Sequence, residues 1–409
     1  MKKISDRFLR KIHVTRTAFG LFFTCLLLSV SMVRADGEFR VGAENMKAYL
    51  PLLQGKQVAL VGNQSSLIGN VHLLDTLQRC GIEVVKIFCP EHGFRGEAEA
   101  GAEVKSGVDI KSGVPIVSLY GRNKKPRDKD MKVDVVVFDI QDVGARFYTY
   151  ISTLHYVMEA CAENEVPIIV LDRPNPNGFY VDGPVLDTSL RSFVGMHPVP
   201  IVHGMTMGEY ARMINGEKWL KDQIRCHLTV IPMSGYYHAM QYSLPIAPSP
   251  NLQTDNAVLL YPSLCLFEGT KVSVGRGTTQ PFECIGFPGN KTGNFTFKPV
   301  SLKGIAVHPP YEHKTCKGTD LKGEGYRLFT AQKLNLQYLI TMYQAYPDKK
   351  NFFSSFFDKL SGTENLRKQI MDGKTEKEIR ESWEPALSQY KVMRKKYLLY
   401  PETAEKTVE

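Results

Sequence analysis

Short apolar runs that alternate with segments of helical spacing are the feature that most constrains this chain. Strands are predicted at residues 57–64, 83–89, 114–121, 133–142, 166–171 and 227–232. These runs are almost continuously apolar, as are strands that are buried on both faces. Helices are predicted between them, at residues 71–80, 147–164 and 206–220. Strands that alternate with helices form parallel sheets through right-handed crossovers, so we predict a Rossmann-like α/β fold.

The length of the chain, 409 residues, exceeds the usual size of one domain, so a second domain is expected. Residues 245–251 contain three prolines and no helical pattern, which places the domain boundary there. We predict a Rossmann-like domain at residues 36–248 and a smaller α+β domain at residues 249–409. The second domain has a glycine-rich block, short strands, and amphipathic helices at residues 329–346 and 376–396.

The first 35 residues predict a secretory signal peptide. Residues 1–16 are basic, residues 18–33 are almost wholly apolar, and residues 33–35 match the small-residue pattern before a cleavage site. We therefore expect cleavage after Ala35 and a periplasmic or secreted protein with no stable membrane span. The alternative is an uncleaved anchor, although the apolar run is short for a membrane-spanning helix.

Charge and cysteine content narrow the classes of partner. The formal net charge is +9, but residues 1–35 hold seven Lys or Arg and one Asp, a net of +6, so +3 is left for the rest. This excess is too small to predict nucleic-acid binding.

Seven of the eight cysteines follow residue 35 without a C-x-x-C pair, which disfavours a zinc site. Several lie in apolar patterns typical of a core, and an odd number cannot all form internal disulfides.

Polar side chains follow four of the predicted strands. The groups are Asn63 with Gln64, Glu91 with His92, Asp139 with Gln141 and Asp142, and Asp172 with Arg173. The carboxyl ends of parallel strands lie at one edge of a sheet, where α/β proteins bind their ligands. A single polar strand end is usually a turn or a helix cap, whereas four in register favour a binding site.

A nucleotide cofactor and a metal ion are two alternatives for this edge of the sheet. The turn after the first strand has neither G-x-G-x-x-G nor G-x-x-x-x-G-K-[ST], and no basic residue for a phosphate. His92 and a strand-end aspartate could bind a metal, but no H-x-H or H-E-x-x-H spacing supports coordination. We therefore predict neither a cofactor nor a metal.

Glu91 is the best catalytic candidate. Pro90 ends the preceding strand because proline cannot donate to a central ladder, so the carboxylate leaves the sheet there. Glycoside hydrolysis needs an acid that protonates the leaving oxygen and a second group that stabilises or attacks the oxocarbenium centre. Partial burial beside an apolar strand would favour the protonated form that such an acid needs. The alternative is a structural salt bridge between Glu91 and Arg95.

Several motifs in one order resemble the NamZ exo-β-N-acetylmuramidases, glycoside hydrolase family 171, formerly a domain of unknown function. They lie at residues 88–96, 138–150, 171–176, 192–196, 267–270 and 275–278. The resemblance implies a Rossmann-like N-terminal domain, a smaller C-terminal domain, a cleft between them and no nucleotide cofactor. It also implies release of terminal N-acetylmuramic acid from the non-reducing end of peptidoglycan fragments, with Glu91 as the catalytic glutamate.

The implied substrate makes a chemical demand on the site. N-acetylmuramic acid carries a lactyl carboxylate, which the planar guanidinium of an arginine binds well. The candidates are Arg95, Arg146, Arg173 and Arg276. The N-acetyl group could itself act as nucleophile, with Asp139 or Asp142 orienting it. Further substrate contacts are predicted at Asn63, His92, Gln141, Tyr148, Asp172 and Glu268.

The expected partners are disaccharides, muropeptides and peptidoglycan chain ends that carry N-acetylmuramic acid. The residues leave two other functions open, a non-catalytic cell-wall sugar-binding protein and a cofactor-dependent sugar-modifying enzyme. The second catalytic group and the stereochemical course are open too, because the separation of two carboxyl groups in space decides them.

Overall fold

The computed structural model describes residues 38–95 and 106–404. The predicted signal peptide lies outside the described residues, as does Gly96 of the motif at residues 88–96. Among the helices of the described part, none is both long and apolar enough to cross a membrane.

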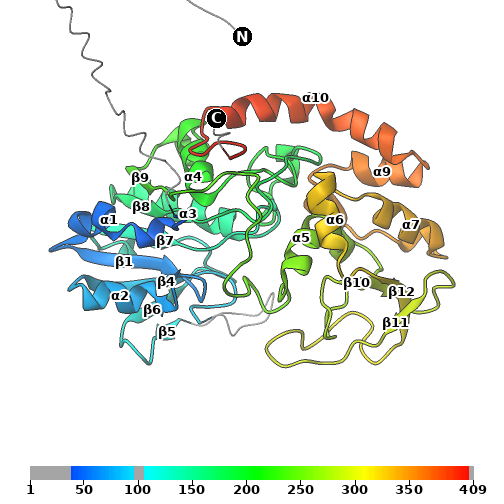
Figure 1. The fold of residues 1–409 in the computed structure, drawn as a ribbon, viewed down its shortest axis with the longest axis horizontal. Helices are drawn as coiled ribbons and strands as arrows, with labels where there is room; N and C mark the ends of the chain where they lie inside the picture. The colour runs from blue at the N-terminus through cyan, green and yellow to red at the C-terminus, as the bar shows by residue number, and fades with distance from the viewer. Residues whose placement is uncertain (1–37, 96–105, 405–409) are drawn as a thin grey trace, which may run out of the picture. The chain divides into compact units, whose positions relative to one another are not determined.

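A seven-stranded sheet is built by the first part of the chain (Figure 1). Its order is β5 (Gly107–Val108), β6 (Pro115–Ser118), β4 (Glu83–Cys89), β1 (Gln57–Gly62), β7 (Val135–Asp139), β8 (Ile168–Leu171) and β9 (Leu228–Ile231). β5 pairs with β6 antiparallel, and every other neighbouring pair is parallel. The predicted parallel α/β sheet is therefore confirmed, and each predicted strand belongs to it.

Helices cover both faces of this sheet, which explains why its strands are apolar throughout. The helices are α1 (Met46–Leu53), α2 (Leu73–Arg79), α3 (Tyr150–Glu163) and α4 (Met207–Gly216). Val58 and Leu60 of β1 share a core with α1 and α2. Ala59 and Val61, which alternate with them along the strand, share the other core with α3 and α4. Fully burying a Val or Leu side chain contributes roughly 1.5–3 kcal/mol, so these two cores hold the helices in place.

Polar caps set where several helices begin. Thr206 and Thr375 each start a helix with a reciprocal capping box, to Glu209 and Glu378 respectively, as their sequence spacing predicts. The helix predicted at residues 71–80 begins two residues late, because Val71–His72 forms β3 and pairs with β2 (Leu67–Ile68). Such caps satisfy backbone amides that have no partner in the first turn.

The second part of the chain contains a smaller sheet and most of the remaining helices. Its elements are α5 (Asp255–Leu264), β10 (Cys284–Phe287), β11 (Phe295–Phe297), β12 (Cys316–Asp320), α6 (Glu324–Ala331), α7 (Gln337–Ala345), α8 (Phe356–Ser361), α9 (Asn365–Met371) and α10 (Glu376–Lys395). The strands form an antiparallel sheet in the order β10-β12-β11. Short 3-10 helices lie at Gly42–Glu44, Asp128–Asp130, Thr188–Leu190, Lys221–Gln223, Cys265–Gly269 and Lys349–Asn351.

The helix predicted at residues 329–346 is wrong as a single element. α6 ends at Ala331, and Gln332 takes a left-handed backbone with φ of 50°, so the chain turns before α7 begins. The predicted boundary between residues 248 and 249 falls in a helix-free loop ahead of α5, and the boundary itself stays a prediction.

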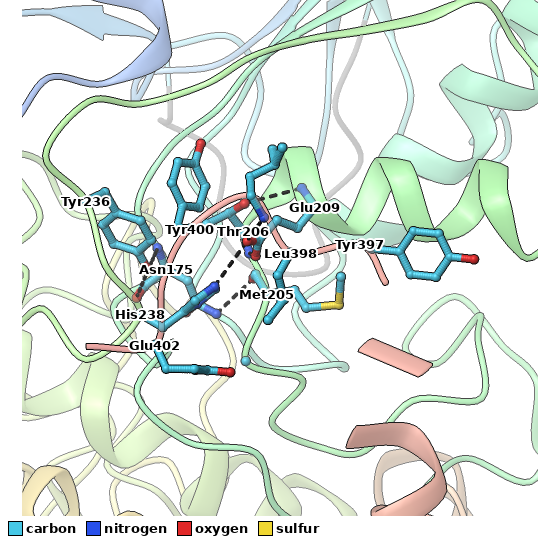
Figure 2. Close-up of polar contacts among 12 residues, drawn as sticks. Asn175, Met205, Thr206, Glu209, Tyr236, His238, Tyr397, Leu398, Tyr400 and Glu402 are labelled. Atoms are coloured by element: carbon cyan, nitrogen blue, oxygen red, sulfur yellow. Dashed lines mark hydrogen bonds and ion pairs between the residues drawn. The ribbon is translucent and has the colours of Figure 1, made fainter. Parts of the chain in front are cut away.

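The end of the chain packs back onto the Rossmann-like part. The Tyr400 hydroxyl donates a hydrogen bond to the Asp172 carboxylate at 2.7 Å. The Leu399 amide donates a hydrogen bond to the Glu209 carboxylate at 2.8 Å. This carboxylate also lies 3.1 Å from His238 Nε2 (Figure 2). The Tyr400 side chain, which is buried, and the Leu399 backbone therefore complete a buried region that begins in the first part of the chain.

Candidate active site

A cavity of about 570 Å³ lies beyond the carboxyl end of β4, and both parts of the chain line it. Its polar and charged lining includes Glu91, His92, Tyr120, Thr149, Glu268, Arg276 and His308. Its aromatic lining includes Phe147, Tyr148, Phe193, Tyr261, Phe282 and Phe356. This volume falls within the range of roughly 300–1,000 Å³ that is usual for small-molecule sites. We call it the Glu91 cavity.

The turn after β4 brings Glu91 and His92 to this cavity. The Gly93 amide closes the turn on the Pro90 carbonyl at 3.1 Å. His92 and Gly93 both have left-handed backbones, with φ of 72° and 78°. Glycine adopts this conformation freely, whereas at His92 it costs conformational free energy. Such strained residues cluster at functional sites, where the position of the side chain matters.

Two hydroxyl groups approach the Glu91 carboxylate. Thr149 Oγ1 donates a hydrogen bond to Glu91 Oε2 at 2.9 Å. Burial, together with the charge of Glu91 and a hydrogen bond to it, raises the pKa of Tyr120 above its ordinary value. Thr149 stands at the N-cap position of α3, yet its side chain makes no capping hydrogen bond. The Thr149 hydroxyl therefore hydrogen-bonds to the Glu91 carboxylate and does not cap the N-terminus of α3.

A second carboxylate and a cation lie together on the C-terminal wall. Arg276 Nε lies 2.6 Å from Glu268 Oε1, and the Arg276 guanidinium stands 5.0 Å from the centre of the Phe282 ring. The two side chains keep 18% and 26% of their surface exposed, so the pair is accessible from the cavity. Burial, the largest single influence, lowers the pKa of Arg276, but the charge of Glu268 and the hydrogen bond to it act together with neighbouring groups and raise the pKa above its ordinary value.

Tyr148 forms part of a rigid aromatic wall. Its hydroxyl donates to the Pro248 carbonyl at 2.9 Å, and its ring packs edge-on against Tyr150 and Tyr261. Burial raises the pKa of Tyr148 well above its ordinary value. Of the predicted site residues, the Glu91 cavity therefore brings together Glu91, His92, Tyr148, Glu268 and Arg276.

The predicted contacts Asp139 and Arg173 are buried behind the rim, where they bind each other. Arg173 Nε lies 2.5 Å from Asp139 Oδ1, and its Nη2 lies 2.8 Å from Oδ2. A second bond from Nη2 reaches the Leu67 carbonyl at 2.8 Å. This bidentate pair joins the ends of β7 and β8, and neither residue lines the Glu91 cavity.

The predicted contact Asp172 belongs to the buried region that the C-terminal residues complete. Its carboxylate accepts hydrogen bonds from the Thr206 hydroxyl, the Gly208 amide and the Tyr400 hydroxyl, each at 2.7 Å. Figure 2 shows the neighbouring Thr206, Glu209 and Tyr400 side chains. Burial, with the charge of Glu209, raises the pKa of Asp172 to about 6 despite these donors. Asp172 does not line the Glu91 cavity.

Arg146 and Arg95 also lie away from the Glu91 cavity. Arg146 is fully buried and donates to the carbonyls of residues 184, 199 and 360, at 2.8–2.9 Å. Burial lowers the pKa of Arg146 to about 9. Arg95 forms a bidentate pair with Asp109, at 2.9 and 3.1 Å, and lines a separate cavity of about 440 Å³.

Asn63, Gln141 and Asp142 organise the loops at the sheet edge without lining the Glu91 cavity. Asn63 Nδ2 donates to the Tyr150 hydroxyl at 3.0 Å. Gln141 Nε2 donates to the carbonyls of residues 142 and 174, at 2.8 and 2.6 Å. Asp142 Oδ2 accepts from the Gly144 amide at 2.7 Å.

Sequence reasoning did not single out Tyr120, Thr149 or His308 as site residues. Tyr120 follows a predicted strand and Thr149 lies within the motif at residues 138–150, so both had a weak signal. His308 precedes two prolines in a stretch without a recognisable pattern. Within residues 38–95 and 106–404, no three His, Cys, Asp or Glu side chains are grouped so that they could hold a metal ion. The seven cysteines of this part all have free thiols.

Two family models match nearly all of the described chain. The model described as "Exo-beta-N-acetylmuramidase NamZ, N-terminal" matches residues 58–256, and "Exo-beta-N-acetylmuramidase NamZ, C-terminal" matches residues 259–400. The chain belongs to the NamZ family. It has the two-domain NamZ architecture, with the Glu91 turn in the N-terminal domain and the Glu268–Arg276 pair in the C-terminal domain.

Relatives of known sequence or structure agree with membership of the NamZ family. "Peptidoglycan beta-N-acetylmuramidase NamZ" of Bacillus subtilis (strain 168) is 41% identical over 373 residues, which cover 86% of this chain and 89% of that protein. A crystal structure of a DUF1343 family protein from Bacteroides fragilis NCTC 9343 is 46% identical, with a TM-score of 0.82 over 90% of this chain and 100% of that one. A second crystal structure of a DUF1343 family protein, from the same organism, is 27% identical, with a TM-score of 0.73 over 88% of this chain and 99% of that one.

Proposed function

We propose that this protein is an exo-acting β-N-acetylmuramidase of peptidoglycan turnover. It releases terminal N-acetylmuramic acid from the non-reducing end of peptidoglycan fragments. The observation that carries this proposal is the place of Glu91, on a strained turn at the wall of a sugar-sized cavity, in a chain of the NamZ family. The Bacillus subtilis relative, a peptidoglycan β-N-acetylmuramidase by description, supports the same reaction.

Glu91 serves as the acid and base of the reaction. In glycoside hydrolysis the acid gives its proton to the glycosidic oxygen, and the bond from that oxygen to C1 of the muramic acid breaks. Water then adds to C1 and gives a proton back to the carboxylate, which restores the acid. The hydrogen bond from Thr149 and the contact with the Tyr120 hydroxyl hold the carboxyl group in one orientation. Fixed orientation of this kind lowers the barrier because the acid is already aligned with the oxygen that it protonates.

Glu268 is the group best placed to act as the second carboxylate. Glu91 and Glu268 are the acidic side chains among the described residues that line the Glu91 cavity. Asp139 and Asp142, which would orient an N-acetyl nucleophile, are instead bound to Arg173 and to the Gly144 amide behind the rim. The geometry therefore favours Glu268 as the residue that stabilises the developing positive charge.

Arg276 is the candidate for the lactyl carboxylate. Among the four arginines considered from the sequence, it is the one that lines the Glu91 cavity. Its guanidinium is oriented by Glu268 and by the Phe282 ring, which leaves further N–H donors for a ligand carboxylate.

We also propose that the protein works outside the cytoplasmic membrane, in the periplasm or the medium. Residues 1–35 match the pattern of a signal peptide, which directs the mature protein across that membrane. The ligands expected there are disaccharides and muropeptides that end in N-acetylmuramic acid.

Release of N-acetylmuramic acid from the disaccharide N-acetylmuramyl-N-acetylglucosamine tests the proposed function. Purified wild-type protein should release the sugar, and Glu91→Gln should abolish release while retaining the fold and most of the binding. Glu83→Gln, at the exposed first position of the same strand, is the matched control and should keep full activity. Binding without release by the wild-type protein would show a sugar-binding protein instead. A requirement for added NAD would show a cofactor-dependent enzyme.

A further inference from the structure

A second concave site lies on the small antiparallel sheet, next to the Glu91 cavity. It has a volume of about 370 Å³ and is formed by residues 277–280, by β11 with Lys298, and by Val300 and Leu302. We call it the outer groove. No part of the reaction proposed above uses these residues.

The outer groove and the Glu91 cavity share a thin wall. Arg276 lines the cavity, and the next residue, Gly277, lines the outer groove. A Cβ atom on Gly277 would lie 2.5 Å from Pro309 Cγ, which belongs to the cavity wall, and 2.6 Å from the carbonyl oxygen of Val300, which belongs to the groove. The Val300 amide donates to the Gly277 carbonyl at 2.8 Å. Because a Cβ atom would clash on both sides, only a glycine fits at position 277. The backbone of Gly277 therefore contacts the wall of the cavity on one side and the wall of the groove on the other.

The lining of the outer groove suits the faces and edges of sugar rings. Phe295 and Phe297 stand side by side on β11, with ring centres 6.1 Å apart and an angle of 27° between their planes. Phe297 is buried in a small core with Cys284 and Cys316 and supports Phe295, which is half-buried and offers its ring to the groove. An aromatic face of this kind packs against apolar ring surfaces. Thr279 and Lys298 are exposed beside them and offer a hydroxyl and a cation. A row of polar groups beside an apolar platform is typical of carbohydrate sites, since a sugar ring has apolar faces and a hydroxylated edge.

The edge of the small sheet adds a further point of recognition. β11 pairs with β12 on one side, and in the described sheet it has no strand on its other side. Backbone groups of an edge strand are available to a ligand as well as to another strand. An N-acetyl group, which carries one amide donor and one acceptor, matches this type of edge.

We propose that the outer groove binds the glycan strand that extends beyond the disaccharide held in the Glu91 cavity. This inference rests on the proposed function. An exo-acting enzyme encloses the terminal sugar, so the rest of the strand has to leave the cavity across its wall. The groove receives the next N-acetylated amino sugars on the reducing-end side of the bond that is cleaved. It thereby favours polymeric fragments over the free disaccharide.

Chain-length dependence of hydrolysis tests the outer groove. The value of kcat/KM is measured for N-acetylmuramyl-N-acetylglucosamine and for the tetrasaccharide made of two such units. We expect the wild-type protein to prefer the tetrasaccharide by about tenfold, which corresponds to ~1.4 kcal/mol. Phe295→Ser and Thr279→Val should remove this preference and leave disaccharide hydrolysis unchanged. Tyr326→Ser, an exposed aromatic residue on α6 outside both sites, is the control and should keep it.

Two results would overturn the inference. One is an active wild-type protein that cleaves both substrates with equal kcat/KM; the other is a preference for the tetrasaccharide that survives in both groove variants. If the wild-type protein releases no sugar at all, the proposed function fails, and calorimetric titration of both oligosaccharides then decides on the groove. Tighter binding of the tetrasaccharide that is lost in Phe295→Ser supports it, and equal binding refutes it.

Discussion

Replacing Thr149 by valine removes the hydroxyl that holds Glu91 and keeps the shape of the side chain. Hydrogen bonds to a charged group contribute about 1.5–3 kcal/mol. If the bond of 2.9 Å to Glu91 Oε2 persists in the transition state, its loss should lower kcat/KM roughly 10- to 150-fold, at 1.36 kcal/mol for each factor of ten. The fold should not suffer, because this hydroxyl does not cap α3.

The assay is release of N-acetylmuramic acid from the disaccharide, with the free energy of unfolding measured in urea beside it. Thr149→Ser restores a hydroxyl and should recover activity to within about threefold of wild type. Thr153→Val is the matched control one turn along α3, since its hydroxyl donates to the Thr149 carbonyl at 3.4 Å and does not line the cavity. A Thr149→Val protein that is stable and keeps wild-type kcat/KM would refute the positioning role. So would equal losses in the valine and serine variants.

Three other predictions concern the cation, the buried carboxyl and the N-terminus. Arg276→Lys should raise KM for the disaccharide about tenfold in steady-state kinetics, because a lysine cannot bind a carboxylate through two parallel hydrogen bonds. The KM for a substrate whose lactyl carboxylate is amidated should not change in this variant. Asp172 keeps a proton in the folded chain up to a pKa of about 6, so its contribution to the free energy of unfolding should fall by about 3 kcal/mol as the pH rises from about 4 to 6. Urea titrations of wild type and Asp172→Asn across this range should differ in slope, and parallel curves would contradict the shift. N-terminal sequencing of protein recovered outside the cytoplasm should begin at Asp36, whereas Met1 there would argue for an uncleaved anchor.

The sheet could be predicted from the sequence because its strands are buried on both faces. β4 has the bounds that its apolar run predicts, residues 83–89, and Pro90 marks its end. α5 was not predicted, since Pro262 inside it and the prolines before it are typical of loops. Its nine buried residues show that tertiary packing outweighs this local signal.

The site could be predicted in part, because a strand end shows which residues reach the rim but not which way they face. Glu91 reaches the cavity through a turn that Pro90 and Gly93 predict in the sequence. Asp139 and Arg173 stand at the same rim, but 34 residues apart in sequence, and only the fold shows that they neutralise each other. The wall at residues 305–310 comes from a loop with no periodicity, so no pattern could have assigned it to the site.

The docking of Tyr400 has a consequence for how the protein is made. Synthesis runs from the N-terminus, and domains generally fold as they emerge. Here the carboxyl group of Asp172 has to wait for a hydroxyl that lies 228 residues further along the chain. Until that residue arrives, the first domain lacks a piece of its own interior. The two segments that the NamZ models match therefore complete their folding together. A fragment that stops at residue 248 would lack Tyr400 and would leave the Asp172 region of the core incompletely packed.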